Sequence, residues 1–181
     1  MNNIFQDKEF KKKYPIFLVS HNLYWKSWYQ EEINKISMIL KDVEFNSYHI
    51  GSTAIEGIFA KNIIDIIIEV KDENEICKTV KLLGEKYSKR WQEDKRAFFV
   101  KGYGENGFEE KVFHIHIRHL RDIDEVYFRD YLEKNPSVAK KYEELKLIAE
   151  EKFRNDREAY TKSKSEFIKK YTEIEKISRL Q

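Results

Sequence analysis

Residues 63–70 read Ile-Ile-Asp-Ile-Ile-Ile-Glu-Val, and this run constrains the fold more than any other part of the chain. Nearly every position carries a β-branched apolar side chain, which is typical of a strand buried on both faces of its sheet. Such a strand has neighbours on each side and layers packed above and below it. We therefore expect an α/β (α+β) domain with this strand inside its sheet.

Asp65 interrupts the apolar run. An unpaired buried carboxylate is very costly, so Asp65 needs a metal ion, a cation or several hydrogen-bond donors beside it. Mg2+ that also bridges to phosphate groups would meet that need. Because side chains alternate along a strand, Asp65, Ile67 and Glu69 share one face, which makes Glu69 a second candidate metal ligand.

Just before this strand, residues 49–53 read His-Ile-Gly-Ser-Thr. A strand that ends in Gly51 and opens a helical turn offers free backbone amides, the hydroxyls of Ser52 and Thr53, and the positive end of a helix dipole. These groups suit a phosphate, although Gly-Ser is also common in ordinary turns. With an acidic residue on the next strand, we favour a phosphate or nucleotide site. Lys61 lies between the two elements and is equally compatible with this site and with a solvated loop.

Two histidines, His114 and His116, flank a single isoleucine in a later predicted strand. Alternation sends both imidazoles to one face, where they can ligate a transition metal or contact phosphate; a lone strand histidine more often only bonds at the edge of a core. We therefore consider Asp65, His114 and His116 candidate catalytic residues, and Asp65, Glu69 and His116 candidate metal ligands. Arg96, at the open end of the same predicted hairpin, could neutralise a phosphate.

The remaining sequence supplies the elements around these motifs. Apolar periodicity predicts a helix, a strand, the buried strand, a second helix and a hairpin of two strands, over residues 23–40, 45–50, 63–70, 76–83, 95–101 and 111–118. From about residue 123 onward only helices are expected. We therefore divide the chain into an N-terminal segment (1–22), an α/β core (23–122) and a C-terminal helical part (123–181) packed on the core.

Cap signals mark where the C-terminal helices begin. Asn135 followed by Pro136 predicts an N-cap with proline at the first helical position. Asn155, with Glu158 three residues later, resembles a capping box for one last helix.

Two pairs in this helical part place an aromatic and a basic side chain four residues apart: Tyr142 with Lys146, and Tyr160 with Lys164. Residues four apart share a helical face, and the combination suits stacking on a base and holding a phosphate. A lysine-rich helix also produces such pairs by spacing alone. If the pairs are functional, Lys146, Tyr160 and Lys164 close the nucleotide pocket from the helical side.

Composition excludes several classes of protein. The chain has 34 Lys and Arg against 32 Asp and Glu, a formal net charge of +2, so no whole-molecule attraction for nucleic acid is expected. No apolar run approaches the ~20 residues of a membrane helix, and the polar N-terminus does not resemble a secretory signal. We expect a cytoplasmic protein. The single cysteine, Cys77, is expected to be a buried or half-buried structural thiol.

These motifs resemble those of the GrpB-like proteins. The strings from Tyr48 to Gly57 and from Ala60 to Ile66 are similar to that family's His-hydrophobic-Gly-Ser-Thr and Ala-Lys-Pro-Ile-Ile-Asp-Ile motifs, and His114-Ile-His116 is similar to its His-Leu-His strand. The resemblance spans residues 23–170. It extends into the helical part at Phe128-Arg-Asp-Tyr-Leu132, Pro136, Ala139, Tyr142, Leu145, Lys146, Asp156, Tyr160 and Lys164.

The resemblance implies a nucleotidyltransferase-like fold: a mixed β-sheet flanked by helices, with a Gly-Ser phosphate turn and a neighbouring acidic strand. Members with transferase chemistry usually carry two carboxylates two residues apart on that strand and a third on a later one, because two Mg2+ ions must be held. Here Ile67 occupies the second position, and the later strand offers His114 and His116 instead of an acid.

Three functions follow as hypotheses. The leading one is a protein that binds a nucleoside triphosphate with Mg2+ and transfers a nucleotidyl group to a small acceptor. The alternative is a catalytically silent module that binds a nucleotide or a phosphorylated metabolite. The third is a transition-metal hydrolase that uses Asp65, His114 and His116 with zinc or manganese.

Overall fold

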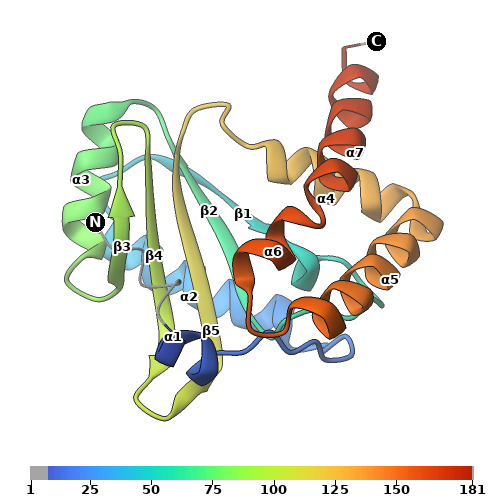
Figure 1. The fold of residues 1–181 in the computed structure, drawn as a ribbon. Coiled ribbons are helices and arrows are strands. Elements are labelled where there is room, and N and C mark those ends of the chain that lie inside the picture. Colours follow the sequence, from blue (N-terminus) through green and yellow to red (C-terminus); the bar gives the residue numbers. More distant parts are fainter. Residues whose placement is uncertain (1–7, 181) are drawn as a thin grey trace.

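A computed structural model describes residues 8–180, which form a five-stranded mixed sheet flanked by helices (Figure 1). The strands lie in the order β1-β2-β5-β4-β3. β2 and β5 are parallel, and the other neighbouring pairs are antiparallel. The strands are β1 (Phe45–Ile50), β2 (Ile64–Val70), β3 (Ser88–Gln92), β4 (Arg96–Gly104) and β5 (Gly107–His119). The predicted fold class is confirmed.

Helices surround this sheet on the described part of the chain. In Figure 1, α3 lies beside the β3 end of the sheet, whereas α4, α5, α6 and α7 gather toward the β1 end. The helices are α1 (Lys8–Lys13), α2 (Trp25–Ile39), α3 (Glu73–Leu83), α4 (Asp124–Lys134), α5 (Pro136–Phe153), α6 (Arg157–Lys162) and α7 (Ser165–Ser178), with a short 3-10 helix, η2 (Ser52–Ala54).

β2 is buried on both faces, as its β-branched sequence predicts. Ile64, Ile66 and Ile68 are completely buried in the core that α2 and α3 form with the sheet. On the opposite face, Ile67 packs with Ile50 and with a valine of α4. Since burying one isoleucine side chain contributes roughly 1.5–3 kcal/mol, this strand fixes the centre of the fold.

Two expectations about the α/β part are wrong. β3 was not anticipated, because its sequence Ser-Lys-Arg-Trp-Gln is largely polar and it pairs with β4 alone at the edge of the sheet. Such an edge strand needs little apolar character. Cys77, expected to be a buried or half-buried thiol, is exposed on α3, whose buried side is formed by Ile76, Val80 and Leu83.

The predicted last helix is in fact two helices, α6 and α7. The cap of α6 is Asp156 and not Asn155, since the Asp156 carboxylate accepts a hydrogen bond from the backbone amide of Ala159 at 3.1 Å. Pro136 is the first residue of α5, as predicted. Asn135 makes no side-chain cap; its amide donates to the carbonyl of Tyr131 at 2.8 Å.

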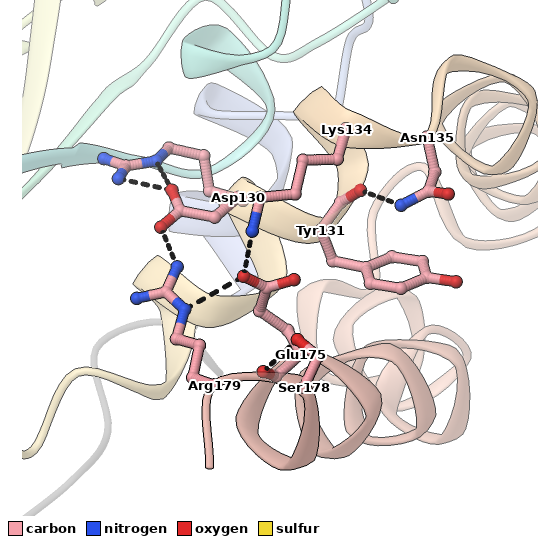
Figure 2. Close-up of polar contacts among 8 residues, drawn as sticks. Asp130, Tyr131, Lys134, Asn135, Glu175, Ser178 and Arg179 are labelled. Atoms are coloured by element: carbon pink, nitrogen blue, oxygen red, sulfur yellow. Dashed lines mark hydrogen bonds and ion pairs between the residues drawn. The ribbon is translucent and has the colours of Figure 1, made fainter. Parts of the chain in front are cut away.

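Ion pairs join α4 to α7 (Figure 2). The Glu175 carboxylate is 2% exposed, and it accepts hydrogen bonds from Lys134 at 2.5 Å and Arg179 at 2.9 Å. Arg179 also pairs with Asp130 of α4. Because α4 and α7 touch along much of their length, these contacts place α7 and the α6–α7 junction relative to the sheet.

The chain before α2 packs onto this assembly. Ile16 is completely buried with Ala149 and Tyr160 of the helical part. Val19 forms an isolated bridge with Ala60, just ahead of β2. No helix within residues 8–180 is both long enough and apolar enough to cross a bilayer.

Candidate functional site

Strand pairing gathers the predicted site residues around Asp65. Its antiparallel partner is Ile50, the last residue before the Gly-Ser-Thr turn. Its parallel partner is His114, and His116 lies opposite Ile67 one pleat farther along β5. The turn, the aspartate and both histidines therefore come from three adjacent strands at one end of β2.

Gly51 brings the turn against the carboxylate. Its φ of +72° is in the left-handed region, and a Cβ atom at this position would lie 2.6 Å from Asp65 Oδ2. Only glycine fits here without displacing the carboxylate. The turn and Asp65 line one small cavity of about 110 Å3.

Both imidazoles face Asp65 Oδ1. His114 Nδ1 lies 3.1 Å from this oxygen and His116 Nε2 lies 3.6 Å from it. The three candidate ligand atoms lie within 4.8 Å of one another. On its other side, His114 Nε2 hydrogen-bonds the Tyr103 hydroxyl at 2.7 Å, which in turn accepts from Arg157 at 3.5 Å.

These neighbours set the charge of the aspartate. Burial acts to raise the pKa of Asp65, but the adjacent His114 and His116 outweigh it and hold that pKa well below its ordinary value. Burial lowers the pKa of His114 despite its contact with Asp65. At neutral pH the site therefore presents an ionised carboxylate beside a neutral His114 imidazole.

Three lysines line the same small cavity: Lys61, Lys146 and Lys164. Burial, followed by the charges of neighbouring cations, lowers the pKa of Lys61 to about 8 and of Lys164 to about 7. Burial also lowers the pKa of Lys146 to about 7. Cations crowded in this way are destabilised until an anion neutralises them, so the cavity is suited to a phosphate group.

Tyrosine rings hold two of these lysines in place. Lys146 Nζ lies 5.0 Å from the centroid of the Tyr142 ring, and Lys164 Nζ lies 4.2 Å from the Tyr160 centroid. Both tyrosines are buried and line the cavity. Both pairs line the small cavity, but only Tyr142 and Lys146 share a helix, because α6 ends at Lys162 and Lys164 lies at the α6–α7 junction. Lys61, between the turn and β2, also faces the cleft.

A larger hollow of about 720 Å3 adjoins the small cavity and shares Lys61, Asp65 and Tyr160 with it. Its walls include both histidines and Arg157. Sequence reasoning missed Arg157 because nothing in its local pattern on α6 points to β5. Tyr103 was missed for a similar reason, since it lies in the irregular part of β4 beyond the predicted strand end.

Glu69 is not at this site, contrary to expectation. It shares a face with Asp65, but it lies four positions farther along β2, about 13 Å away. Its carboxylate is buried and accepts hydrogen bonds from Asn46 and Tyr48 at 3.0 Å and from the backbone amide of Arg121 at 2.7 Å. Glu69 is therefore a structural residue.

Arg96 is also outside the cleft. It lies opposite Arg118 in the sheet, at the Glu69 end, and its guanidinium pairs with Asp122 at 2.5 and 2.6 Å. The sequence placed Arg96 on the correct hairpin. It did not reveal which end of the sheet that hairpin opens toward.

The donor set fits a pair of Mg2+ ions poorly. Mg2+ prefers oxygen ligands in octahedral geometry, and here one carboxylate oxygen faces two imidazole nitrogens. The position two residues beyond Asp65 is Ile67, which is completely buried against α4. A two-ion arrangement of carboxylates therefore has no place at these positions.

Comparison with known sequences matches residues 15–174 to the family described as GrpB protein. The chain belongs to this family. The glutamate-rich protein GrpB of Alkalihalophilus pseudofirmus is 34% identical over 163 residues, covering 86% of this chain and 93% of the relative. A UPF0157 protein of Pseudomonas aeruginosa is 32% identical over 148 residues, covering 80% of this chain and 61% of the relative.

The fold is similar to that of several solved structures. GrpB from Enterococcus faecalis is similar with a TM-score of 0.77 at 23% identity, covering 91% of this chain and 100% of that one. The Cid1 poly(U) polymerase bound to MgATP is similar with a TM-score of 0.51 at 11% identity, covering 72% of this chain and 43% of that one. Likeness at such identities concerns the fold and not the activity.

Proposed function

We propose that this GrpB protein binds a nucleoside triphosphate, with its phosphates on the Gly51-Ser52-Thr53 turn and among the three cavity lysines. Phosphate oxygens would accept hydrogen bonds from turn amides and hydroxyls and neutralise Lys61, Lys146 and Lys164. A divalent cation that accompanies the phosphates would contact Asp65. With Mg2+, phosphate oxygens and water would supply the remaining ligands.

The observation that carries this proposal is the meeting of three cationic side chains with the turn at one cavity that also contains Asp65. The chain as a whole is almost electrically balanced, with 34 basic and 32 acidic side chains. Lys146 is buried and Lys61 and Lys164 are half-buried, and an anionic ligand would stabilise the charged forms of all three. The adjoining hollow of about 720 Å3 provides room for the rest of a nucleotide.

If the protein is an enzyme, its reaction is transfer of a nucleotidyl group to a small acceptor. An acceptor oxygen would form a bond to the α-phosphorus while the bond from that phosphorus to the β-phosphate breaks. Pyrophosphate would leave, and the acceptor's proton would pass to water. The lysines would stabilise negative charge on the departing phosphates. The cytoplasm is the expected location.

The second candidate is a catalytically silent module that binds the same ligand. It is favoured by one observation: Ile67 fills the position where a second carboxylate would be needed, and it is completely buried. Measuring pyrophosphate release in the presence of candidate acceptors distinguishes the two. Binding without release supports the module, and acceptor-dependent release supports the transferase.

Thermal unfolding with each of the four common nucleoside triphosphates, at millimolar ligand and with a divalent cation, tests the proposed binding. A ligand present at 100 times its Kd adds about 2.7 kcal/mol to stability, which shifts Tm clearly. We expect at least one nucleotide to raise Tm of the native protein. The shift should largely disappear in Lys164→Gln, which removes one cavity cation.

Lys169→Gln is the matched control, because Lys169 is exposed on α7 and outside the cavity. It should keep the full ligand-induced shift. If no triphosphate raises Tm, or if Lys164→Gln and Lys169→Gln respond alike, the cavity does not bind nucleotide phosphates.

A further inference from the structure

We infer that Asp65, His114 and His116 form a binding site for one transition-metal ion of the Zn2+, Co2+ or Ni2+ class, which the protein holds without any nucleotide. This inference deepens the proposed function, since it names the metal of the same cleft. It also distinguishes a metal ion that the protein side chains bind by themselves from Mg2+ that enters only together with the phosphates.

The spacing of the three donors suits a single small ion. Tetrahedral ligands about 2.1 Å from Zn2+ are about 3.4 Å from one another. The distances from Asp65 Oδ1 to His114 Nδ1 and His116 Nε2 are 3.1 and 3.6 Å, and the donors lie within 4.8 Å of one another. They come from two adjacent, parallel strands of the buried sheet, so their backbones are fixed before an ion arrives.

Outer contacts hold the two imidazoles in position for this role. His114 Nε2 is engaged by the Tyr103 hydroxyl at 2.7 Å, which leaves Nδ1 directed at Asp65. The Phe98 ring stacks on His116 at 4.9 Å and meets His114 edge-on at 5.1 Å. Metal-binding histidines usually have such a partner on the nitrogen that does not ligate the ion, as His114 does here.

Hydrogen bonding alone explains His114 but not His116. A network from Arg157 through Tyr103 and His114 to Asp65 is complete without an ion. His116, in contrast, has a buried Nδ1 without a hydrogen-bond partner within residues 8–180, and its Nε2 is 3.6 Å from Asp65, beyond hydrogen-bond length. An ion would engage Nε2, the nitrogen that faces Asp65 without a hydrogen bond to it, and would leave Nδ1 as it is.

The donor types select the class of metal. Imidazole nitrogen suits Zn2+, Co2+, Ni2+ and related ions, whereas Mg2+ requires mainly carboxylate, carbonyl, phosphate or water oxygen. With three protein donors, one coordination position remains for an outside ligand. Asp65 also lines the cavity of the phosphate turn, so a phosphate oxygen in that cavity is the expected occupant of the open position.

Calorimetric titration of the chelator-treated full chain, without nucleotide, tests the inference directly. We expect Zn2+ and Co2+ to bind with one ion per chain and Mg2+ to give no binding. Bound Co2+ should give the visible absorption of a nitrogen-ligated ion of low coordination number. The variants His116→Gln and His114→Gln should lose at least about tenfold in Zn2+ affinity, and Tyr103→Phe, which removes an outer contact, should lose about tenfold.

His119→Gln is the matched control on the same strand, because His119 is half-buried at the other end of β5, where its imidazole hydrogen-bonds the carbonyl of Leu120. It should bind Zn2+ like the native protein. Equal binding of Mg2+ without nucleotide, or Zn2+ affinity unchanged in His116→Gln, overturns the inference. If a histidine variant does not fold, the Co2+ spectrum of the native protein tests the inference instead. Absence of the absorption expected for nitrogen-ligated Co2+ would then overturn it.

The metal site and the phosphate site can fail separately. If the protein binds no metal but a nucleotide raises its Tm in a way that depends on Lys164, the metal inference is wrong and the proposed function stands. If it binds the metal but no nucleotide raises its Tm, the proposed function is wrong and the metal inference stands. Lys164 is outside the donor set, so its variant reports on phosphate alone.

Discussion

At the scale of single residues, Gly51 and Asp65 define the site. The glycine adopts a left-handed conformation that brings its backbone against the carboxylate, and the carboxylate is held ionised by two histidines. Gly51 directly follows β1 and Asp65 lies on β2 opposite Ile50, so the sheet register brings the two residues together. The site therefore tolerates little change in either residue.

Replacing Gly51 with alanine should be more damaging than the same change at Gly57. Both glycines have positive φ, +72° and +75°, so each substitution carries about 1 kcal/mol of backbone strain. A Cβ at Gly51 would also overlap Asp65 Oδ2, whereas a Cβ at Gly57 has no atom within 4 Å. Overlap of this kind adds roughly 1–3 kcal/mol.

Urea unfolding of the two alanine variants measures this difference. We expect Gly51→Ala to lose clearly more unfolding free energy than Gly57→Ala and also to lose nucleotide binding. Equal losses for the two variants would mean that the turn does not press against the aspartate.

Phosphate binding should weaken as pH rises, because Lys146 and Lys164 have pKa values of about 7 in the ligand-free protein. Below that pH both lysines are charged and attract an anion; above it they lose their protons. Pyrophosphate titrations between about pH 6 and pH 9 should show falling affinity in the native protein. The decline should be shallower in Lys164→Gln, and parallel declines in the two proteins would contradict the assignment.

Without ligand, Lys164 should destabilise the folded protein at low pH. A pKa lowered from 10.5 to about 7 means that charged Lys164 is disfavoured in the folded state. This penalty is fully present below pH 7 and disappears as pH rises toward the unfolded value. Without ligand, Lys164→Gln should therefore raise Tm at about pH 6 and have less effect at about pH 10. A lower Tm at acid pH would show that the cation is well solvated.

At the scale of elements, sequence periodicity predicted the parts with strong apolar patterns: α2, β1, β2, α3 and the β4–β5 hairpin. It did not predict the features of secondary structure that depend on tertiary contacts. β3 is polar and stabilised by its pairing with β4, and the break between α6 and α7 depends on packing against α4 and α5.

For the site, local patterns identified the turn, Asp65, the histidine pair and the lysines. They did not show that Arg157 and Tyr103 lie at the site. They also did not show that Glu69 and Arg96 lie outside it. Those placements depend on which strand ends meet in the sheet and where α6 crosses it. Such long-range geometry has no signature in a window of neighbouring residues.

The ion pairs between α4 and α7 should contribute measurably to stability. Burial acts to raise the pKa of Glu175, but hydrogen bonds from Lys134 and Arg179 lower it below the ordinary value. Replacing Glu175 with glutamine keeps the shape and removes the charge, which should cost about 1–2 kcal/mol near neutral pH. The difference from the native protein should shrink as pH falls through the carboxyl pKa.

Glu173→Gln, on the same helix, is the control. The Glu173 side chain is 55% exposed and its ion pair with Lys176 is 3.3 Å long, so its loss should cost less than about 0.5 kcal/mol. Urea unfolding compares the two variants. If Glu173→Gln lowers the unfolding free energy as much as Glu175→Gln does, the α4–α7 ion pairs stabilise the protein no more than an exposed ion pair.

At the scale of the whole molecule, a nearly neutral chain concentrates cations in one cleft between the sheet and the C-terminal helices. The sheet supplies the turn, the aspartate and the histidines, and the helical part supplies Lys146, Tyr160 and Lys164. Neither part contains the full site. Ligand binding should therefore stabilise the packing of one part on the other.

A crystal structure of the protein grown with ATP and a divalent cation tests the central claim most directly. We predict phosphate density within hydrogen-bond distance of the Ser52–Thr53 turn and Lys164, with the cation against Asp65. A nucleotide bound elsewhere on the surface, with this cleft still lined by the Lys61, Lys146 and Lys164 side chains and holding only water, would contradict it.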